Sequence, residues 1–349
     1  MPAQVVDLFC GVGGLTCGLI QAGLNVIAGF DLDPTCRYTY EHNNHVNYHL
    51  RNIREVAGPD INALFDENAT SILVGCAPCQ PFSQMRFKMG RANTNDDKYN
   101  LLLEFGRLIE ETQPTVISME NVPQIKESDV YREFTRLLAR NGYHYSAKVV
   151  YCPEYGIPQT RRRFVLVGSQ LGDIQLIPPT HEPTDIHVGD FIHNLPELEA
   201  GQIDPHDPLH RSSALSERNL RRIQASIPGG TWLDWPEELR CACHRKRSGT
   251  TYASVYGRMT WNQIGPTITT QFYNYGTGRF GHPEQNRALS IREGAILQTF
   301  PRDYDFIDPE KPFVIRDVAR HIGNAVPVRL GEVIGISIVQ HLHDYGIEA

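Results

Sequence analysis

A glycine-rich turn between a strand-like and a helix-like segment, close to the start of the chain, is the feature that most limits its fold. The apolar residues 4–9 (QVVDLF) predict a buried strand, and residues 14–23 (GLTCGLIQAG) predict a helix that ends at a glycine. Between them, DLFCGVGG (7–14) contains three glycines, which let the backbone approach a ligand closely above a helix N-terminus. The turn is typical of a nucleotide-binding βα unit, although a tight turn without a ligand could have the same composition.

Strand-like and helix-like segments continue to alternate through the first half of the chain. Further strands are predicted at 25–30, 71–76, 115–120 and 163–168. Further helices are predicted at 34–43, 101–112 and 130–142. Strands that alternate with helices of this length form βαβ units, so we predict an α/β fold with a Rossmann-like parallel sheet.

The pattern changes near Ser169. From there to about Asn286, proline, glycine, histidine and aromatic residues are frequent, and only residues 214–227 have clear helical spacing. Residues 290–300 again predict a helix, and the apolar residues 327–342 predict a helix that returns to the first sheet. Because 349 residues exceed what one hydrophobic core usually serves, we predict two domains. The larger comprises residues 1–168 plus 318–349, and the smaller, irregular one comprises residues 169–317.

The composition is that of an ordinary globular protein of the cell interior. The chain is 41% hydrophobic and 21% charged, and neither an export signal nor an apolar run of roughly 20 residues is evident. We therefore expect a cytoplasmic protein with no membrane partner. Its eight cysteines are then mostly reduced, and no disulfide framework is expected. The formal net charge of −7 by itself argues against nucleic acid, but the placement of charge along the chain matters more.

A carboxylate stands where a nucleotide-binding fold needs one. Asp31 ends the second predicted strand, about twenty residues after the glycine turn, at the position that binds ribose hydroxyls in dinucleotide folds. The dinucleotide fingerprint would place its third glycine at position 16, where the chain has Thr16. These features favour an adenosine cofactor without a pyrophosphate, and S-adenosylmethionine fits better than NAD.

Three loops next to predicted strands carry reactive residue types. The loop GCAPCQPFS (75–83) supplies two cysteines, MENVP (119–123) supplies Glu120, and PQTRRRF (158–164) supplies an arginine cluster. Because the carboxyl ends of parallel strands share one edge of a sheet, these residues are expected to meet there. Taken singly, each loop has a plainer interpretation: a redox cysteine pair, a helix cap and a solvated basic face.

Taken in order, the motifs resemble those of the DNA (cytosine-5) methyltransferases. DLFCGVGG is similar to that family's cofactor loop, GCAPCQPFS to its nucleophile motif, ENVP to its glutamate motif and QTRRRF to its arginine motif. RALSIREGAILQTFP (287–301) and GNAVP (323–327) resemble its last two motifs. The resemblance spans nearly the whole chain. It implies an S-adenosylmethionine-dependent methyltransferase fold with a target-recognition domain, here residues 169–317.

The resemblance assigns roles to the loop residues. Cys79 would attack C6 of cytosine as a thiolate, which lets C5 take a methyl group from the sulfonium of S-adenosylmethionine. Glu120 would bond N3 and the exocyclic amine of the base. Arg161 and Arg163 would help to hold the base and Glu120, and Gln159 would support the loop.

The resemblance also implies a cofactor site at the strand ends. The expected contacts come from the glycine turn, from the ends of the second and third strands, from later loops and from the last motif. They are Phe9, Gly11, Val12, Gly14, Asp31, Leu32, Asn52, Ile53, Pro78, Leu101, Asn324 and Ala325. Asn52 stands where the family often has an acidic residue, and Ala325 stands where serine is frequent. An amide oxygen can still accept a bond from the adenine amino group, so we expect at most a modest weakening of cofactor binding.

A cytosine stacked in a duplex must be flipped out before its C5 can react. The polar, partly basic segment 84–100 follows the nucleophile loop and is predicted to close on DNA, although an ordinary exposed loop is the plainer interpretation. The predicted smaller domain is rich in arginine, as a duplex-binding cleft requires. The residues expected to contact DNA are Ser83, Gln84, Arg86, Lys88, Arg91, Arg245 and Arg258.

No metal site is expected from the sequence. CAPC (76–79) and CACH (241–244) could together bind zinc, but Cys-x-Cys is poor zinc spacing, and capture of Cys79 would abolish the implied chemistry. Zinc held by Cys241 and Cys243 alone is a smaller alternative. Cys76 is expected to be a packing residue.

Two other functions are compatible with these motifs. One is methylation of cytosine-5 in tRNA, because an RNA-modifying branch shares the motifs, although the short Cys-Phe-Thr signature of that branch is missing from the sequence. The other is a catalytically silent DNA- or cofactor-binding protein, against which the intact Cys79, Glu120 and arginine set argues. The resemblance further implies a monomeric, nucleoid-associated protein of the bacterial or phage type. Its partners would be double-stranded DNA and a cognate restriction endonuclease that acts on the same sequence.

Overall fold

The computed structural model describes residues 3–78, 100–246 and 254–348 of the chain. The chain divides into two compact units. The first comprises Met1–Tyr155, Arg162–Thr180 and Ala325–Ala349, and the second comprises Gly156–Arg161 and His181–Asn324. The chain thus leaves the first unit at Gly156–Arg161 and returns to it, which the predicted boundaries after residues 168 and 317 do not describe.

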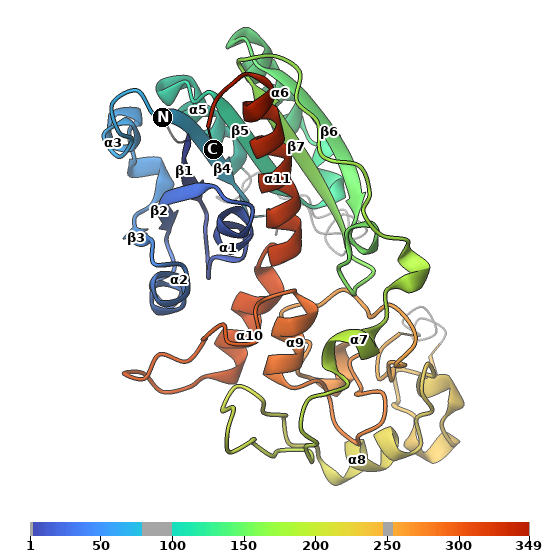
Figure 1. Ribbon diagram of the computed structural model, residues 1–349. Coiled ribbons are helices and arrows are strands. Elements are labelled where there is room, and N and C mark those ends of the chain that lie inside the picture. Colours follow the sequence, from blue (N-terminus) through green and yellow to red (C-terminus); the bar gives the residue numbers. More distant parts are fainter. Residues whose placement is uncertain (1–2, 79–99, 247–253, 349) are drawn as a thin grey trace. The chain divides into compact units, whose positions relative to one another are not determined.

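The first unit contains a seven-stranded sheet in the order β3-β2-β1-β4-β5-β7-β6 (Figure 1). Its strands are β1 (Ala3–Leu8), β2 (Asn25–Asp31), β3 (Asn47–Leu50), β4 (Thr70–Gly75), β5 (Val116–Asn121), β6 (His144–Tyr151) and β7 (Arg162–Ser169). All neighbours from β3 to β5 pair in parallel. The predicted α/β class is confirmed, and β1 lies at the centre of the parallel part.

The last two strands correct the prediction of a wholly parallel sheet. β7 lies between β5 and β6 and runs antiparallel to both. The segment 152–161 joins β6 to β7 directly, whereas a parallel return needs a crossover of roughly a dozen residues or more. β6 itself was not predicted, and most of its residues are exposed.

The first unit contains helices that pack in two groups. The helices are α1 (Gly14–Gln21), α2 (Arg37–Asn44), α3 (Gly58–Asn62), α5 (Leu101–Thr112), α6 (Asp129–Arg140) and α11 (Val328–Asp344). α1 contacts α2 and α11, whereas α5 contacts α3 and α6. The main hydrophobic core joins the sheet to α3, α5 and α6, with Ile61, Phe105 and Phe134 fully buried. The predictions for α1, α2, α5 and α6 are confirmed, although α2 begins at Arg37 rather than Pro34.

α11 packs closely on α1, as predicted for a helix that returns to the first sheet. A Cβ at Gly18 would lie 2.2 Å from the carbonyl oxygen of Val328, and a Cβ at Gly331 would lie 2.8 Å from that of Leu15. Glycine at both positions therefore allows the two backbones to touch. The stretch Ile315–Asp344 is long and apolar enough to cross a membrane, but 67% of its most apolar window is buried inside the protein, as in a core helix.

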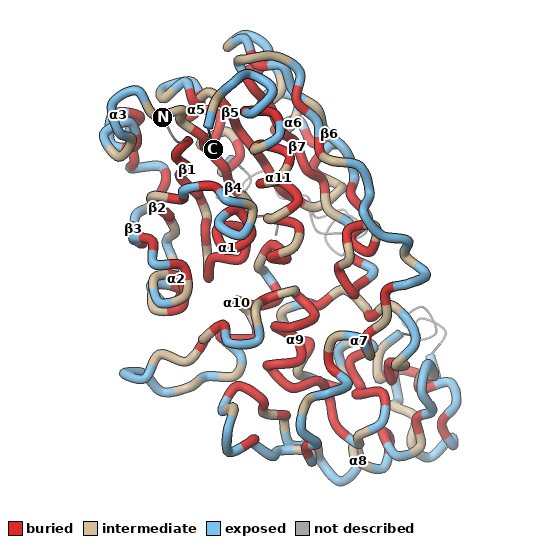
Figure 2. The backbone as a smooth tube through the Cα atoms, viewed as in Figure 1, coloured by how far each residue is buried: buried red, intermediate tan, exposed pale blue. Residues whose placement is uncertain are grey.

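The second unit is irregular and is built around small groups of buried side chains. Its helices are α7 (Val188–Ile192), α8 (Glu217–Gln224), α9 (Ile291–Leu297) and α10 (Ile315–Asn324). Figure 2 shows that α9 is buried along its length, whereas exposed segments surround α8. Ile223 of α8 packs with Trp232, Trp235 and Tyr275 in an apolar cluster. α8 is shorter than the helix predicted at 214–227. It begins at Glu217, where the Ser216 hydroxyl caps it, and ends at Gln224.

Candidate active site

Left-handed backbone shapes the turn after β1. Phe9, Gly11 and Gly13 have φ angles of 61°, 52° and 88°, and α1 begins at Gly14. Val12 is buried, with 2% of its surface exposed. In the part of the chain that the structure describes, a Cβ on Gly11 would meet no atom within 4 Å. The open side of this turn is a cradle that a bound ligand can fill.

Asp31 ends β2 and lies beside this turn. Its Oδ2 accepts the backbone N–H of Gly11 at 2.9 Å, and its Oδ1 accepts those of Leu32 and Asp33 at 2.7 and 3.0 Å. A carboxylate has about four acceptor positions, so a further donor such as a ribose hydroxyl can still bind. Leu32 is 64% exposed and offers apolar surface to a planar ligand.

Asn52 and Ile53 follow β3 but have different environments. Asn52 Oδ1 accepts the N–H of Arg54 at 3.2 Å and caps the short 3-10 helix Ile53–Glu55. A carbonyl oxygen has two lone pairs, so Asn52 can also accept a bond from an adenine amino group. Ile53 is only 5% exposed and packs in the main hydrophobic core. The side chain of Ile53 therefore presents little surface to a ligand, and its cofactor contact stays a prediction.

A buried ion pair occupies the end of β5. Glu120 is 3% exposed, and Arg163 Nε lies 2.9 Å from its Oε1. In the antiparallel register Glu120 is opposite Val165, so Arg163, two residues away on β7, projects to the same face. Among the described residues, Glu120 Oε1 has no partner with hydrogen-bond geometry. The ion pair thus holds the carboxylate of Glu120 at this strand end.

The thiol of Cys76 reaches the same carboxylate. Cys76 follows β4, is half-buried, and has its Sγ 2.8 Å from Glu120 Oε2. The parallel register of β4 and β5 places Gly75 opposite Met119, so the residues that follow these two meet at one edge of the sheet. The prediction that Cys76 is only a packing residue is therefore wrong.

Asn121 anchors the segment that leads to the predicted nucleophile. Its Nδ2 donates to the carbonyl oxygen of Ala77 at 3.0 Å, and its Oδ1 accepts the N–H of Val122 at 2.9 Å. Cys79 lies outside the described residues, and only Pro78 separates it from Ala77 in the sequence. Sequence reasoning gave Asn121 no role, because no spacing along the chain links it to Ala77.

Gln159 and Arg161 belong to the second unit and are hydrogen-bonded within it. The Gln159 side chain is fully buried, and its Nε2 donates to two acceptors at the C-terminal end of α9 at 2.9 and 2.7 Å. Its Oε1 accepts the N–H of Ile268 at 3.0 Å. Arg161 donates to the carbonyl oxygens of Ile268 and Gly323 at 3.0 and 3.5 Å. Of the two arginines expected near Glu120, Arg163 pairs with it, whereas these bonds of Arg161 secure the second unit.

The remaining predicted cofactor residues lie at the ends of elements. Pro78 follows β4 and Leu101 begins α5, and both are half-buried. Asn324 is exposed at the end of α10, and the next residue, Ala325, is half-buried.

The predicted DNA contacts divide into three groups. Ser83, Gln84, Arg86, Lys88 and Arg91 lie outside the described residues. Arg245 is exposed, and its guanidinium donates to the carbonyl oxygen of Glu237 at 3.1 Å.

Arg258 is buried, whereas a predicted DNA contact should be exposed. It is 7% exposed, and its Nη2 donates to Gln285 O and Asn286 Oδ1 at 2.9 and 2.8 Å. Burial lowers the pKa of this guanidinium. A side chain enclosed in this way stabilises the second unit and does not have the exposure that a phosphate contact needs.

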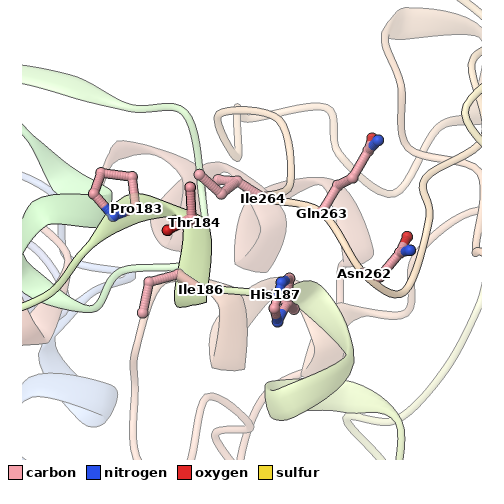
Figure 3. Close-up of a pocket in the computed structure, with 7 residues that line it drawn as sticks. All are labelled: Pro183, Thr184, Ile186, His187, Asn262, Gln263 and Ile264. Atoms are coloured by element: carbon pink, nitrogen blue, oxygen red, sulfur yellow. The ribbon is translucent and has the colours of Figure 1, made fainter.

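The second unit also contains a pocket of about 220 Å³, shown in Figure 3. It is lined by Pro183, Thr184, Ile186, His187, Asn262, Gln263 and Ile264. None of these residues was singled out from the sequence. The pocket combines amide and imidazole groups with apolar surface, without the carboxylate and thiol that meet in the first unit.

Comparison with known proteins gives a match over nearly the full chain. The family model of the C-5 cytosine-specific DNA methylases matches residues 3–340. The type II methylase M.HgiDII of Herpetosiphon aurantiacus is 53% identical over 346 residues, which cover 98% of this chain and 96% of that protein. The type II methyltransferase M1.HphI of Haemophilus parahaemolyticus is 30% identical, with 97% of this chain and 87% of that protein covered.

Solved structures share the fold at low sequence identity. A candidate DNA modification methyltransferase encoded within an E. coli prophage superimposes with a TM-score of 0.74 and 22% identity, covering 98% of this chain and 99% of that one. The Entamoeba histolytica methyltransferase EhMeth superimposes with a TM-score of 0.66 and 17% identity, with coverage of 98% and 99%.

Proposed function

The chain belongs to the C-5 cytosine-specific DNA methylase family, and from this membership we propose the residues that carry out its reaction. The protein is a DNA (cytosine-5)-methyltransferase that uses S-adenosylmethionine as methyl donor. The observation that carries the residue assignment is the buried Glu120–Arg163 pair, which stands at the strand end next to the segment leading to Cys79.

Cys79 is the nucleophile in this proposal. Its thiolate bonds to C6 of a flipped-out cytosine, which raises the electron density at C5. C5 then takes the methyl group, for which the cofactor supplies an electrophilic carbon on a sulfonium. Loss of the C5 proton to a base restores the double bond as the sulfur leaves C6. The covalent adduct thereby divides one difficult substitution into easier steps.

Glu120 holds the ring during this sequence. Its carboxylate suits the exocyclic amine of cytosine as a hydrogen-bond donor, and the charge of Arg163 beside it keeps the carboxylate in place. Cys76, which touches the other carboxylate oxygen, would restrict the rotation of Glu120. Asn121, at the end of β5, would hold the start of the segment that leads to Cys79 by donating to the Ala77 carbonyl.

The turn after β1 is the proposed cofactor site. The open face of Gly11, the remaining acceptor position of Asp31 and the exposed side chain of Leu32 fit a backbone contact, a ribose hydroxyl and an adenine ring respectively. Asn52 would accept a bond from the adenine amino group. The other proposed contacts are Phe9, Val12, Gly14, the backbone of Ile53, Pro78, Leu101, Asn324 and Ala325.

Gln159 and Arg161 are proposed to support catalysis by positioning. Their bonds to Ile268 and to the ends of α9 and α10 give residues 156–161 a defined path before β7 begins at Arg162.

We assign target recognition to residues 169–317. Its irregular character and the excess of basic over acidic residues in the stretch 211–258 support the assignment, and the exposed Arg245 is proposed to contact a DNA phosphate. Ser83, Gln84, Arg86, Lys88 and Arg91 are proposed to act as part of a lid over the flipped base. Methylation of tRNA is the less supported alternative, because the family model and the type II relatives are those of DNA methylases.

The similarity to type II methylases also suggests partners and location. We propose a cognate restriction endonuclease that cuts the same sequence when it is unmethylated. The protein would then act as a monomer on double-stranded DNA at the bacterial nucleoid. Size-exclusion chromatography with light scattering tests the monomer.

Bisulfite sequencing of host DNA after expression of the full chain tests the substrate and gives the recognition sequence. We expect one short duplex sequence to become methylated. Methylated tRNA alongside unmodified DNA would overturn the substrate assignment.

Trapping tests the nucleophile. A duplex with 5-fluorocytosine at the target should give a covalent complex with the wild type, because fluorine cannot leave as a proton does. Cys76→Ser is the matched control and should still form the complex. A complex that persists in Cys79→Ser and disappears in Cys76→Ser would show that the nucleophile is Cys76.

A further inference from the structure

We propose that Cys241, Cys243 and His244, in the second unit, bind one zinc ion. A ligand atom from each of these residues lies within 4.8 Å of the other two. In a tetrahedral site with zinc bonds of about 2.0–2.3 Å, neighbouring ligand atoms stand roughly 3.3–3.8 Å apart. Small side-chain rotations are therefore enough to close the site around the ion.

A tight turn brings the three residues together. The N–H of His244 donates to the carbonyl oxygen of Cys241 at 3.0 Å, and the N–H of Lys246 donates to that of Cys243 at 3.2 Å. Residues three apart in such a turn lie on one side of it, so Cys241 and His244 face each other. The sequence argument against zinc rested on the Cys-x-Cys spacing, which takes no account of how this turn folds.

The imidazole of His244 is held in one orientation. It is 7% exposed and stacks on Trp232, with ring centroids 4.1 Å apart and planes 19° apart. Its Nδ1 accepts the N–H of Cys241 at a long 3.4 Å, so an imidazole lone pair faces the turn. A ring fixed in advance loses little freedom when it binds a metal.

The chemistry of these ligands selects zinc. Thiolate and imidazole are the ligands of structural zinc sites, whereas magnesium and calcium prefer oxygen. Two thiolates balance the charge of the divalent ion. The thiol of Cys241 lies 3.9 Å from the hydroxyl of Tyr256, which packs against the same turn. These residues supply three protein ligands, and water would complete the fourth position.

The ion would connect the turn to the apolar cluster around Trp232. His244 stacks on Trp232, and Tyr256 packs edge-on against Trp235 and Tyr275. A small irregular core gains proportionally more from a metal than a large sheet does. The proposed role is therefore to stabilise the second unit, and it is independent of methyl transfer.

Metal analysis of the full chain tests the site. Protein expressed with added zinc and purified under reducing conditions should contain about one zinc per chain by mass spectrometry of the metal. Cys243→Ser, which changes an exposed residue, should lower the affinity for zinc at least roughly 10-fold. Cys243→His keeps a zinc ligand at this position and should retain the ion. Circular dichroism checks that all variants are folded.

Cobalt(II) provides a second measurement. Substitution for zinc should give a thiolate-to-cobalt charge-transfer band that weakens in Cys243→Ser, together with visible bands typical of tetrahedral geometry. Wild-type protein without zinc and without these bands would overturn the proposal. Equal zinc content in the wild type and Cys243→Ser would do so as well, whether or not the protein methylates DNA.

Discussion

Thr16 Oγ1 donates a 2.7 Å hydrogen bond to Oδ2 of Asp7, directly beneath the glycine turn. Asp7 is fully buried on β1, and the same Thr16 hydroxyl lies 3.1 Å from that of Tyr40. Burial raises the pKa of Asp7 to about 7, the bond from Thr16 opposes the rise, and the charge of Asp31 adds to it. A carboxyl group that titrates near neutral pH, that of Asp7, therefore lies next to the proposed cofactor site.

Asp7→Asn should become more stable relative to the wild type as the pH rises. The pKa of Asp7 is about 7 in the folded chain and 3.8 without burial, so the stability from its protonated form is complete below about pH 4 and is lost as the pH rises through 7. Asparagine stays neutral throughout. The difference in unfolding free energy between variant and wild type should grow by roughly 3 kcal/mol from about pH 5 to pH 8. Urea denaturation across this range measures it, and a difference that is flat with pH would contradict the assignment.

Glu120→Gln should bind cofactor normally but methylate slowly. Glutamine preserves the shape of the side chain but removes the charge that pairs with Arg163 and holds the base. We expect the single-turnover rate of methyl transfer to fall roughly 10²–10⁴-fold. Transfer of a labelled methyl group to DNA measures the rate, and calorimetry with S-adenosylmethionine gives the control. A rate near that of the wild type would remove Glu120 from the mechanism.

Gly11→Ala should weaken cofactor binding more than it weakens the fold. The added Cβ meets no described atom, but Gly11 has a φ of +52°, so the strain costs about 1–2 kcal/mol. The same Cβ would enter the space assigned to the cofactor. Gly23→Ala is the matched control, because Gly23 has a φ of +94° and is equally open. Both variants should lose similar stability, and only Gly11→Ala should raise the Kd for S-adenosylmethionine, by roughly 10-fold or more. Equal Kd values in the two variants would place the cofactor elsewhere.

Arg245→Ala should affect DNA binding, whereas Arg258→Ala should affect stability. Arg245 is exposed, so its loss should weaken DNA binding and reduce the slope of log affinity against log salt concentration by about 1, with stability unchanged. Arg258 is buried and bonded to Gln285 and Asn286, so its loss should lower the melting temperature. Fluorescence anisotropy with labelled duplex and thermal unfolding separate the two. If Arg258→Ala alters only the salt slope and not the melting temperature, Arg258 contacts DNA and does not stabilise the second unit.

The amino-acid sequence alone was sufficient for most of the parallel part of the fold. Apolar strands and periodic helices predicted β1, β2, β4 and β5 together with α1, α2 and α5, because each follows from local spacing, whereas the short β3 and α3 were not predicted. Glycines after the first strand and Asp31 after the second marked one edge of the sheet for the same reason. The antiparallel direction of β7 was not predicted, since strand direction depends on the path of the preceding connection.

Contacts between side chains required the tertiary structure. Residues 120 and 163 lie on strands that pair only after α6 and β6 intervene, so their meeting depends on the register of β5 with β7. The thiol of Cys76 reaches Glu120, and Arg258 is enclosed, through contacts between distant segments. Local periodicity encodes which residues form an element, whereas the proximity of two side chains depends on how the whole chain packs.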